Sequence, residues 1–414
     1  MFFLGYVIFR MTSLKFTLGL TGISAFFNLL VIFLVLFAIF FGLIKSKFDR
    51  QSSIFFLLCS IFIFACFFNL ALHWSVTGFL QTMEYILPWL ALVMILVNRN
   101  HALANYKKYW NWFNKIIVTL IFLGLVEYFA FFILGISLGI ENLAAGAGRY
   151  FVGHISLIQV IDDTDLPYFR FIGPFIEAGD LGMWASVLLV YNLLRKKYFY
   201  VAVLTLAIFV AYSPGALLAL FIAAGAFLVS RSFIGFMFSL IILFFTILWF
   251  QNDIITFYND ILLQKALSLN DRKEGFVGFW QSLPYLLQAY PSGVPYFEDS
   301  SSRFSSGLSF AAVYSFVWAY EHGGVVAFSI YFLVIMYGFF VSSYYVLLTK
   351  YSLLNNEIYI YYLMLFTYII QRATILEYAI VPLLFPIIFL GAFKPKGKES
   401  TESFNRDNEL ISSS

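Results

Sequence analysis

Apolar runs of about 20 residues, separated by short loops rich in Lys and Arg, leave this chain few possible folds. A helix needs about 20 apolar residues, within a range of roughly 17–25, to cross a bilayer. The chain is 62% hydrophobic and 11% charged, whereas soluble domains are roughly 45–50% apolar and about 25% charged. The sequence therefore predicts an all-α polytopic membrane protein. Spans are predicted at about 22–44, 54–72, 79–97, 116–139, 174–194, 233–250, 324–348, 357–371 and 375–393.

The stretch 198–230 is too long for one span and short for two. Proline and glycine in Ser213-Pro214-Gly215 interrupt it near its middle, which predicts two short helices joined by a tight turn. The total is then about 11 transmembrane helices, or about 12 if a poorly apolar segment before Thr21 also spans.

The basic loops give the topology, because Lys and Arg collect on the cytoplasmic side of membrane proteins. With two helices in 198–230, every basic loop falls on one side, so residues 1–393 form a single integral-membrane domain with its C-terminus in the cytoplasm. Polar residues 394–414 are predicted to be a disordered cytoplasmic tail. Two segments, about 140–173 and 251–322, are predicted to be extracytoplasmic. The basic clusters are Lys45/Lys47/Arg50, Arg99/Lys107/Lys108/Lys115, Arg195/Lys196/Lys197, Arg231, Lys350 and Lys394/Lys396/Lys398.

The extracytoplasmic segment 251–322 is the longest polar island of the chain. Loops longer than about 12–15 residues are usually functional or disordered, and this one has enough aromatic residues to pack. We expect a folded cap on the membrane surface, with an aromatic-rich helix that ends at Tyr290-Pro291-Ser292-Gly293. The island closes with Glu321-His322-Gly323-Gly324, which is predicted to enter the next span.

Charged residues near span ends are the candidate site. Arg170, Gly173 and Glu177 open the span at 174–194, where charges are costly unless they are paired or line a wet cavity. They indicate a polar pocket at the outer mouth of the membrane; the alternative is an interfacial anchor. Arginine presents a rigid fork of donors to phosphate oxygens. The outer arginines are therefore candidates for binding a lipid diphosphate: Arg170, Arg272, Arg303 and Arg372.

A transfer reaction would also need a proton acceptor, and the candidates are Glu177, Glu321 and His322. Each residue has a simpler interpretation: Arg272 and Arg303 as solvated loop charges, His322 as a structural histidine, and Arg372 as the partner of Glu377. Small residues at 215, 219 and 223 predict one closely packed helix face. Cys59 and Cys66 lie within one apolar run and are expected to be buried thiols. The sequence has no metal-site spacing, so we expect no metal and no cofactor.

In this order, these patterns resemble the bacterial O-antigen polymerase and ligase superfamily over roughly residues 165–345. The resemblance rests on Arg170…Gly173…Phe175, on Ser213-Pro214-Gly215-Ala216, on Arg272…Trp280 leading to Tyr290–Gly293, and on Glu321–Gly324. Three positions depart from it. Pro214 replaces an arginine that is frequent in the family, and Ala312 and Val313 stand where ligases usually carry a His-Asn pair.

The resemblance implies an integral-membrane glycosyltransferase of the GT-C type in the bacterial inner membrane. Its substrates would be oligosaccharides linked to undecaprenyl diphosphate, in the synthesis of O-antigen of lipopolysaccharide, capsule or exopolysaccharide. The missing His-Asn pair favours a repeat-unit polymerase over a ligase. A transporter or flippase of lipid-linked sugars is the alternative from another class, but no internal repeat is evident. Expected partners are membrane lipids, a chain-length-regulating copolymerase and a flippase, and no nucleic acid.

Overall fold

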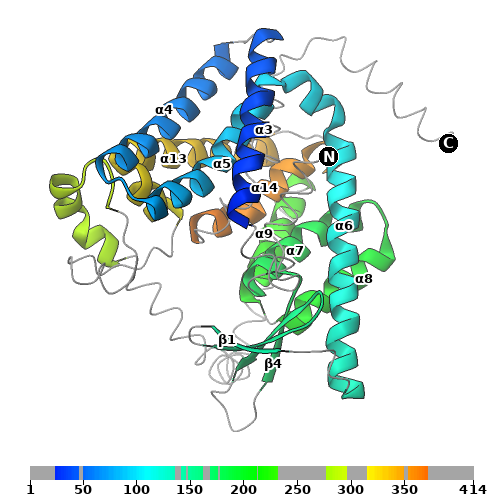
Figure 1. Cartoon of the computed structure of the whole chain (residues 1–414). Coiled ribbons are helices and arrows are strands. Elements are labelled where there is room, and N and C mark those ends of the chain that lie inside the picture. Colours follow the sequence, from blue (N-terminus) through cyan, green and yellow to red (C-terminus); the bar gives the residue numbers. More distant parts are fainter. Residues whose placement is uncertain are drawn as a thin grey trace.

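The computed structural model describes most of the helical part of the chain (Figure 1). Its helices are α3 (Ser24–Lys45), α4 (Arg50–Leu72), α5 (Val76–Val97), α6 (Arg99–Leu134), α7 (Ala178–Leu194), α8 (Tyr198–Ala211), α9 (Pro214–Arg231), α13 (Ser315–Leu348) and α14 (Leu353–Gln371). A further helix covers 277–289. The described residues are 24–45, 50–135, 141–145, 148–161, 168–175, 178–211, 213–231, 277–295, 315–348 and 353–371.

The predicted helical membrane architecture is confirmed in its coarse form. Within the described ranges, four helices have the length and apolar character needed to cross a bilayer, and five shorter apolar helices accompany them. The predicted spans 233–250 and 375–393, the tail 394–414 and most of the island 251–322 lie outside the described residues. The four long apolar segments are Ser53–Leu72, Val76–Val97, Lys108–Leu134 and Phe316–Tyr344.

The turn predicted in the middle of 198–230 is present. Helix α8 ends at Ala211 and α9 begins at Pro214, where proline's fixed φ and missing N–H suit the first position of a helix. The small-residue face of α9 also packs as predicted: Ala219 and Ala223 are buried. A Cβ added at Gly215 would overlap the ring of Tyr368 on α14, so this face admits a neighbouring helix at close range.

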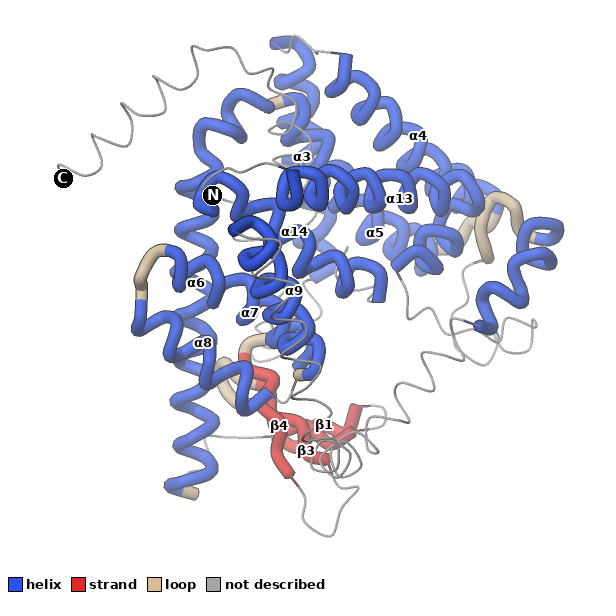
Figure 2. The backbone as a smooth tube through the Cα atoms, turned by 180° about the vertical axis from the view of Figure 1, so that it is seen from behind, coloured by secondary structure: helices blue, strands red, loops and turns tan. Residues whose placement is uncertain are grey.

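A small antiparallel sheet, which the all-α expectation did not include, lies in the segment that follows α6 (Figure 2). Its strands are joined in sequence order, so the sheet is a meander. The described residues of segment 140–173 are therefore folded, and β4 is the last strand before α7 in the sequence. The strands are β1 (Glu141–Ala145), β2 (Gly148–Val152), β3 (Leu157–Ile161) and β4 (Tyr168–Gly173).

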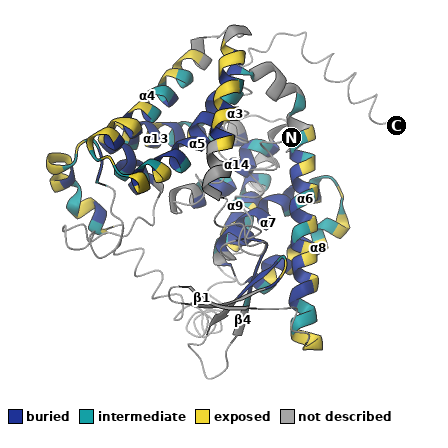
Figure 3. Ribbon diagram, in the orientation of Figure 1, coloured by how far each residue is buried: buried dark blue, intermediate teal, exposed yellow. Residues whose placement is uncertain are grey.

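Helix α7 is the centre of the packing around the sheet. Nearly all its residues are buried (Figure 3), which is typical of a helix that is apolar on every side. It contacts α8, α9, α14 and β4. Helices α4 and α6, by contrast, expose rows of large apolar side chains, as helices facing lipid do.

The ends of α7 and α14 away from the sheet are joined by an ion pair. Arg195 donates from Nη1 and Nη2 to the two carboxylate oxygens of Glu357, at 2.8 and 2.7 Å. The Lys197 ammonium donates to the Asn111 side chain of α6 at 3.2 Å. The basic segments near residues 111 and 195–197 therefore lie at one end of the structure.

Two predicted boundaries are wrong. Residues 99–115 were expected to be a loop because of their positive charges, but they are the first turns of α6. Helix α13 begins at Ser315, not near Gly324, and the two glycines interrupt it instead. In both places a helix continues into a polar stretch that a hydrophobicity criterion assigns to a loop. Cys59 and Cys66 are buried free thiols, as predicted.

Candidate functional site

The structure brings together two motifs that lie about 30 residues apart. The turn Tyr290–Gly293, which follows the helix at 277–289, packs against the interruption of α13 at Glu321–Gly324. We call these the docked turn and the helix break. At the break, Gly324 has φ 63° and ψ −155°, a conformation that is essentially restricted to glycine. A Cβ added at Gly324 would overlap backbone atoms of the docked turn.

Backbone hydrogen bonds hold the docked turn in place. The N–H of Val294 donates to the carbonyl of Glu321 at 3.0 Å, and the N–H of Val325 donates to the carbonyl of Pro291 at 3.0 Å. An interrupted helix leaves carbonyl and amide groups without their usual partners. The docked turn supplies those partners, so the two motifs stabilise each other.

A buried asparagine on α4 ties the same region to the membrane helices. Asn69 is 0% exposed, and its side-chain amide donates to the carbonyls of Glu321 at 3.1 Å and Val294 at 3.3 Å. Sequence reasoning missed this residue. The available signal was a lone amide in an otherwise apolar run, which is costly in a membrane unless it is hydrogen-bonded.

The two predicted proton acceptors at the helix break differ in surroundings. The His322 ring is 5% exposed and stacks on Tyr85 of α5, with ring centroids 4.3 Å apart and planes 21° apart. It also meets the Trp318 ring at 5.4 Å. Glu321 is partly exposed. In the docked turn, burial and the neighbouring Tyr285 raise the pKa of Tyr290.

Arg170 lies in another part of the molecule, on β4. It is partly buried, and its Nε donates to the carbonyl of Ala211 at 2.7 Å. That carbonyl belongs to the end of α8, where a cation is favourable because the helix dipole is negative there. Arg170 therefore joins the sheet to the turn between α8 and α9.

A second residue that sequence reasoning missed is Glu127 of α6. Its carboxylate accepts hydrogen bonds from the backbone N–H groups of His154, Ile155 and Ser156, the last at 2.8 Å, and from the Ser156 hydroxyl at 2.6 Å. These residues form the turn between β2 and β3. Glu127 thus fixes the sheet, and with it the strand that carries Arg170, on α6. A single acid within a spanning helix was the available signal.

The predicted site residues are thus placed only in part. Glu321 and His322 lie at the helix break, and Arg170 lies at the sheet; β4 and α13 occupy separate regions in both views (Figures 1 and 2). Four predicted residues lie outside the described ranges: Glu177, Arg272, Arg303 and Arg372. Across the described ranges, no group of three His, Cys, Asp or Glu side chains forms a metal site.

Comparison with known proteins gives no further assignment: no family model, curated protein or solved structure matches this chain.

Proposed function

We propose that this protein is a polysaccharide repeat-unit polymerase, a membrane glycosyltransferase that acts on the extracytoplasmic face. It transfers a growing glycan from undecaprenyl diphosphate to a lipid-linked acceptor repeat unit. The observation that carries the proposal is the docking of Tyr290–Gly293 onto Glu321–Gly324. Both segments belong to the resemblance with the O-antigen polymerase and ligase superfamily, and their contact gives those weak motifs a shared structural reason to occur together.

The chemistry needs few protein groups. An acceptor hydroxyl oxygen attacks the anomeric carbon of the donor sugar, and the bond from that carbon to the diphosphate oxygen breaks. The bonding electrons leave with undecaprenyl diphosphate, and the hydroxyl proton passes to a base. Because the leaving group is already good, the enzyme has to align the acceptor, neutralise the diphosphate and accept the proton.

Arg170 is the proposed diphosphate ligand with a described position. It comes from a folded sheet, and its Nε is already fixed on the end of α8, which limits the orientations of the guanidinium. A ligand held in this way loses little conformational entropy when it binds. Arg272, Arg303 and Arg372 are proposed as further ligands from other outer segments.

For the base, we propose Glu177, Glu321 or His322. Glu321 is partly exposed, whereas His322 is packed against Tyr85 and Trp318. Because that packing covers His322, an acceptor hydroxyl reaches Glu321 without a side-chain rearrangement. At the helix break, we therefore favour Glu321 over His322 as the base.

The test is reconstitution of purified protein with synthetic undecaprenyl-diphosphate-linked repeat units. A ladder of products with increasing numbers of repeat units supports a polymerase. Single transfer to a lipid or protein acceptor would show a ligase instead. Movement of the lipid-linked sugar across the membrane without a new glycosidic bond would show a transporter and overturn the proposal.

Arg170 gives a sharper prediction within that assay. A charge-assisted contact to phosphate contributes roughly 1.5–3 kcal/mol, so Arg170→Ala should slow turnover by about 10–150-fold. Arg170→Lys keeps the charge but loses the planar fork, and should recover only part of the rate. Each variant is first checked for folding by its thermal unfolding midpoint. Wild-type rates for both Arg170→Ala and Arg272→Ala would place the site elsewhere.

A further inference from the structure

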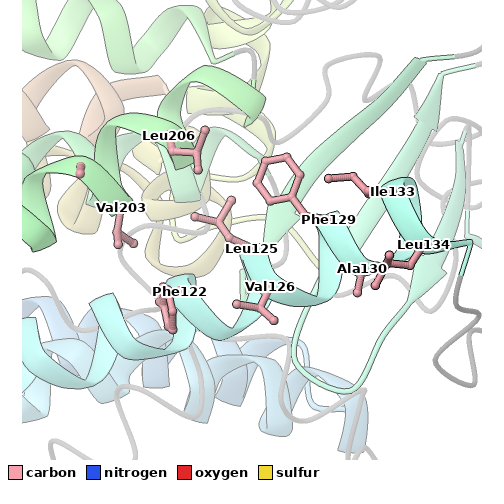
Figure 4. Close-up of a pocket in the computed structure, with 10 residues that line it drawn as sticks. Phe122, Leu125, Val126, Phe129, Ala130, Ile133, Leu134, Val203 and Leu206 are labelled. Atoms are coloured by element: carbon pink, nitrogen blue, oxygen red, sulfur yellow. The ribbon is translucent and has the colours of Figure 1, made fainter.

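An apolar groove of about 550 Å³ runs between α6 and α8 and is open along one side. Its α6 wall extends from Phe122 to Leu134, and its α8 wall from Ala202 to Leu206 (Figure 4). Every lining residue is apolar. At 1.5 Å per residue, the α6 wall is about 18 Å long and begins about 10 Å beyond Lys115.

One end of the same two helices carries positive charge. Lys115 lies on α6, seven residues before the groove begins, and Lys197 lies directly before α8. The Lys197 ammonium reaches Asn111 on α6, so both lysines are at this end. Burial, followed by repulsion from Arg195 and Lys115, lowers the pKa of Lys197. Arg195 is already neutralised by Glu357, whereas the two lysines bring further positive charge.

Aromatic rings lie beside the charges and at the start of the groove. Phe122 of α6 meets Phe199 of α8 with ring centroids 5.7 Å apart, at the start of the apolar wall. Trp112 is 43% exposed, and the Lys115 ammonium lies 5.8 Å from its ring. Aromatic residues are enriched where a membrane protein meets the headgroup region. From Lys197 along α8, the order is therefore cation, aromatic ring Phe199 and apolar groove.

We propose that this groove binds one acyl chain of an anionic phospholipid, with its phosphate between Lys115 and Lys197. The order of chemistry along the helices matches the order within such a lipid: charged headgroup, interfacial region and hydrocarbon chain. Basic pockets between transmembrane helices on the cytoplasmic side are known to bind anionic headgroups. The two lysines lie at the end of α6 away from the sheet, whereas the groove reaches the sheet end of α6 at Leu134. The inference does not depend on glycan transfer.

The test uses the full chain purified in zwitterionic detergent, with the thermal unfolding midpoint followed as lipid is added. Dioleoyl-phosphatidylglycerol should raise the midpoint with a saturable concentration dependence, and dioleoyl-phosphatidylcholine should not. Soluble glycerol phosphate supplies the headgroup charge alone and should have no effect. Each surface lysine near an anionic headgroup contributes a factor of about five in affinity, so Lys115→Gln combined with Lys197→Gln should weaken binding by about 30-fold.

Lys108→Gln is the matched charge control, because it lies on the same helix about 10 Å further from the groove; it should change the apparent affinity by less than twofold. To test binding of the acyl chain, Leu206→Trp should fill the groove and abolish the saturable rise of the unfolding midpoint. Leu218→Trp is its control, since Leu218 is a similarly exposed leucine on α9.

Several results would overturn the proposal. Equal effects of the two lipids, or an unchanged affinity in the double lysine variant, would exclude recognition of the headgroup. An equal effect of glycerol phosphate would make this a free-phosphate site. Unchanged binding in Leu206→Trp would exclude the groove, and no response to either lipid would mean that another part of the chain or a protein partner covers it.

Discussion

Gly324→Ala should separate the docked turn from the helix break. The new Cβ would overlap the carbonyl oxygen of Pro291 and lie 2.7 Å from the backbone nitrogen of Gly293. Those are backbone atoms, so no side-chain rotation relieves the overlap and the turn has to move. The matched control is Gly135→Ala. Gly135 also has a positive φ, 62°, but a Cβ there has no neighbour within 4 Å.

The magnitude follows from two contributions. An alanine forced into the backbone conformation of Gly324 costs about 1–3 kcal/mol, and loss of the Val325-to-Pro291 hydrogen bond adds about 1–3 kcal/mol. Gly135→Ala carries only the left-handed backbone cost of about 1–2 kcal/mol. The unfolding entropy is about 2.1 cal/mol/K per residue. For 414 residues, a loss of 1 kcal/mol in unfolding free energy therefore lowers the unfolding midpoint by about 1 °C. We expect midpoints lower by about 2–7 °C for Gly324→Ala and about 1–2 °C for Gly135→Ala.

Two measurements on purified protein check this expectation. The first is the thermal unfolding midpoint of both variants. The second is maleimide labelling of Ser292→Cys, introduced into the wild-type, Gly324→Ala and Gly135→Ala backgrounds. Labelling should be faster only in the Gly324→Ala background, where the docked turn is displaced. The reasoning is refuted if both glycine variants have the same midpoint and residue 292 reacts at one rate in all three backgrounds.

Three further predictions concern other contacts. Glu357→Gln should destabilise the protein by about 3 kcal/mol. This is near the lower end for a broken buried ion pair, because the Arg195 side chain keeps 27% exposure. Replacing both Arg195 and Glu357 by Met should restore most of the thermal unfolding midpoint, and no recovery would contradict the ion-pair explanation. Glu127→Gln removes the charge from several hydrogen bonds, so hydrogen exchange of the backbone amides at 154–156 should accelerate at least tenfold. Unchanged exchange would show that the carboxylate does not hold the turn. Membrane-impermeant thiol labelling of intact cells should reach Ser292→Cys but not Lys196→Cys, and the reverse pattern would invert the topology.

The sequence was a good guide where membrane physics alone decides the structure. The positions of α3, α4 and α5 follow from hydrophobicity over about 20 residues, and the turn at Ser213-Pro214 follows from backbone chemistry. The small-residue face of α9 was readable for the same reason: its spacing of four matches one side of a helix.

The remaining features depend on contacts between distant residues. Asn69 receives its role from carbonyls more than 200 residues away, and Glu127 receives its role from a turn after the next two strands. Helix α13 starts earlier than predicted because the segment before Gly324, although polar at Glu321 and His322, packs on α5 through the His322 ring. No local pattern encodes such partners.

The distance in sequence between Glu127 and its partners has a consequence for how the protein is made. Helix α6 leaves the ribosome before the turn at 154–156 exists, and 27 to 29 residues separate the carboxylate from those amides. At about 5–20 residues per second, the interval is about one to six seconds. During that time the acid sits in a newly inserted helix without the groups that stabilise its charge, where an ionised side chain is costly. Docking of the turn at 154–156 on α6 ends this interval, because its N–H groups and the Ser156 hydroxyl then stabilise the carboxylate.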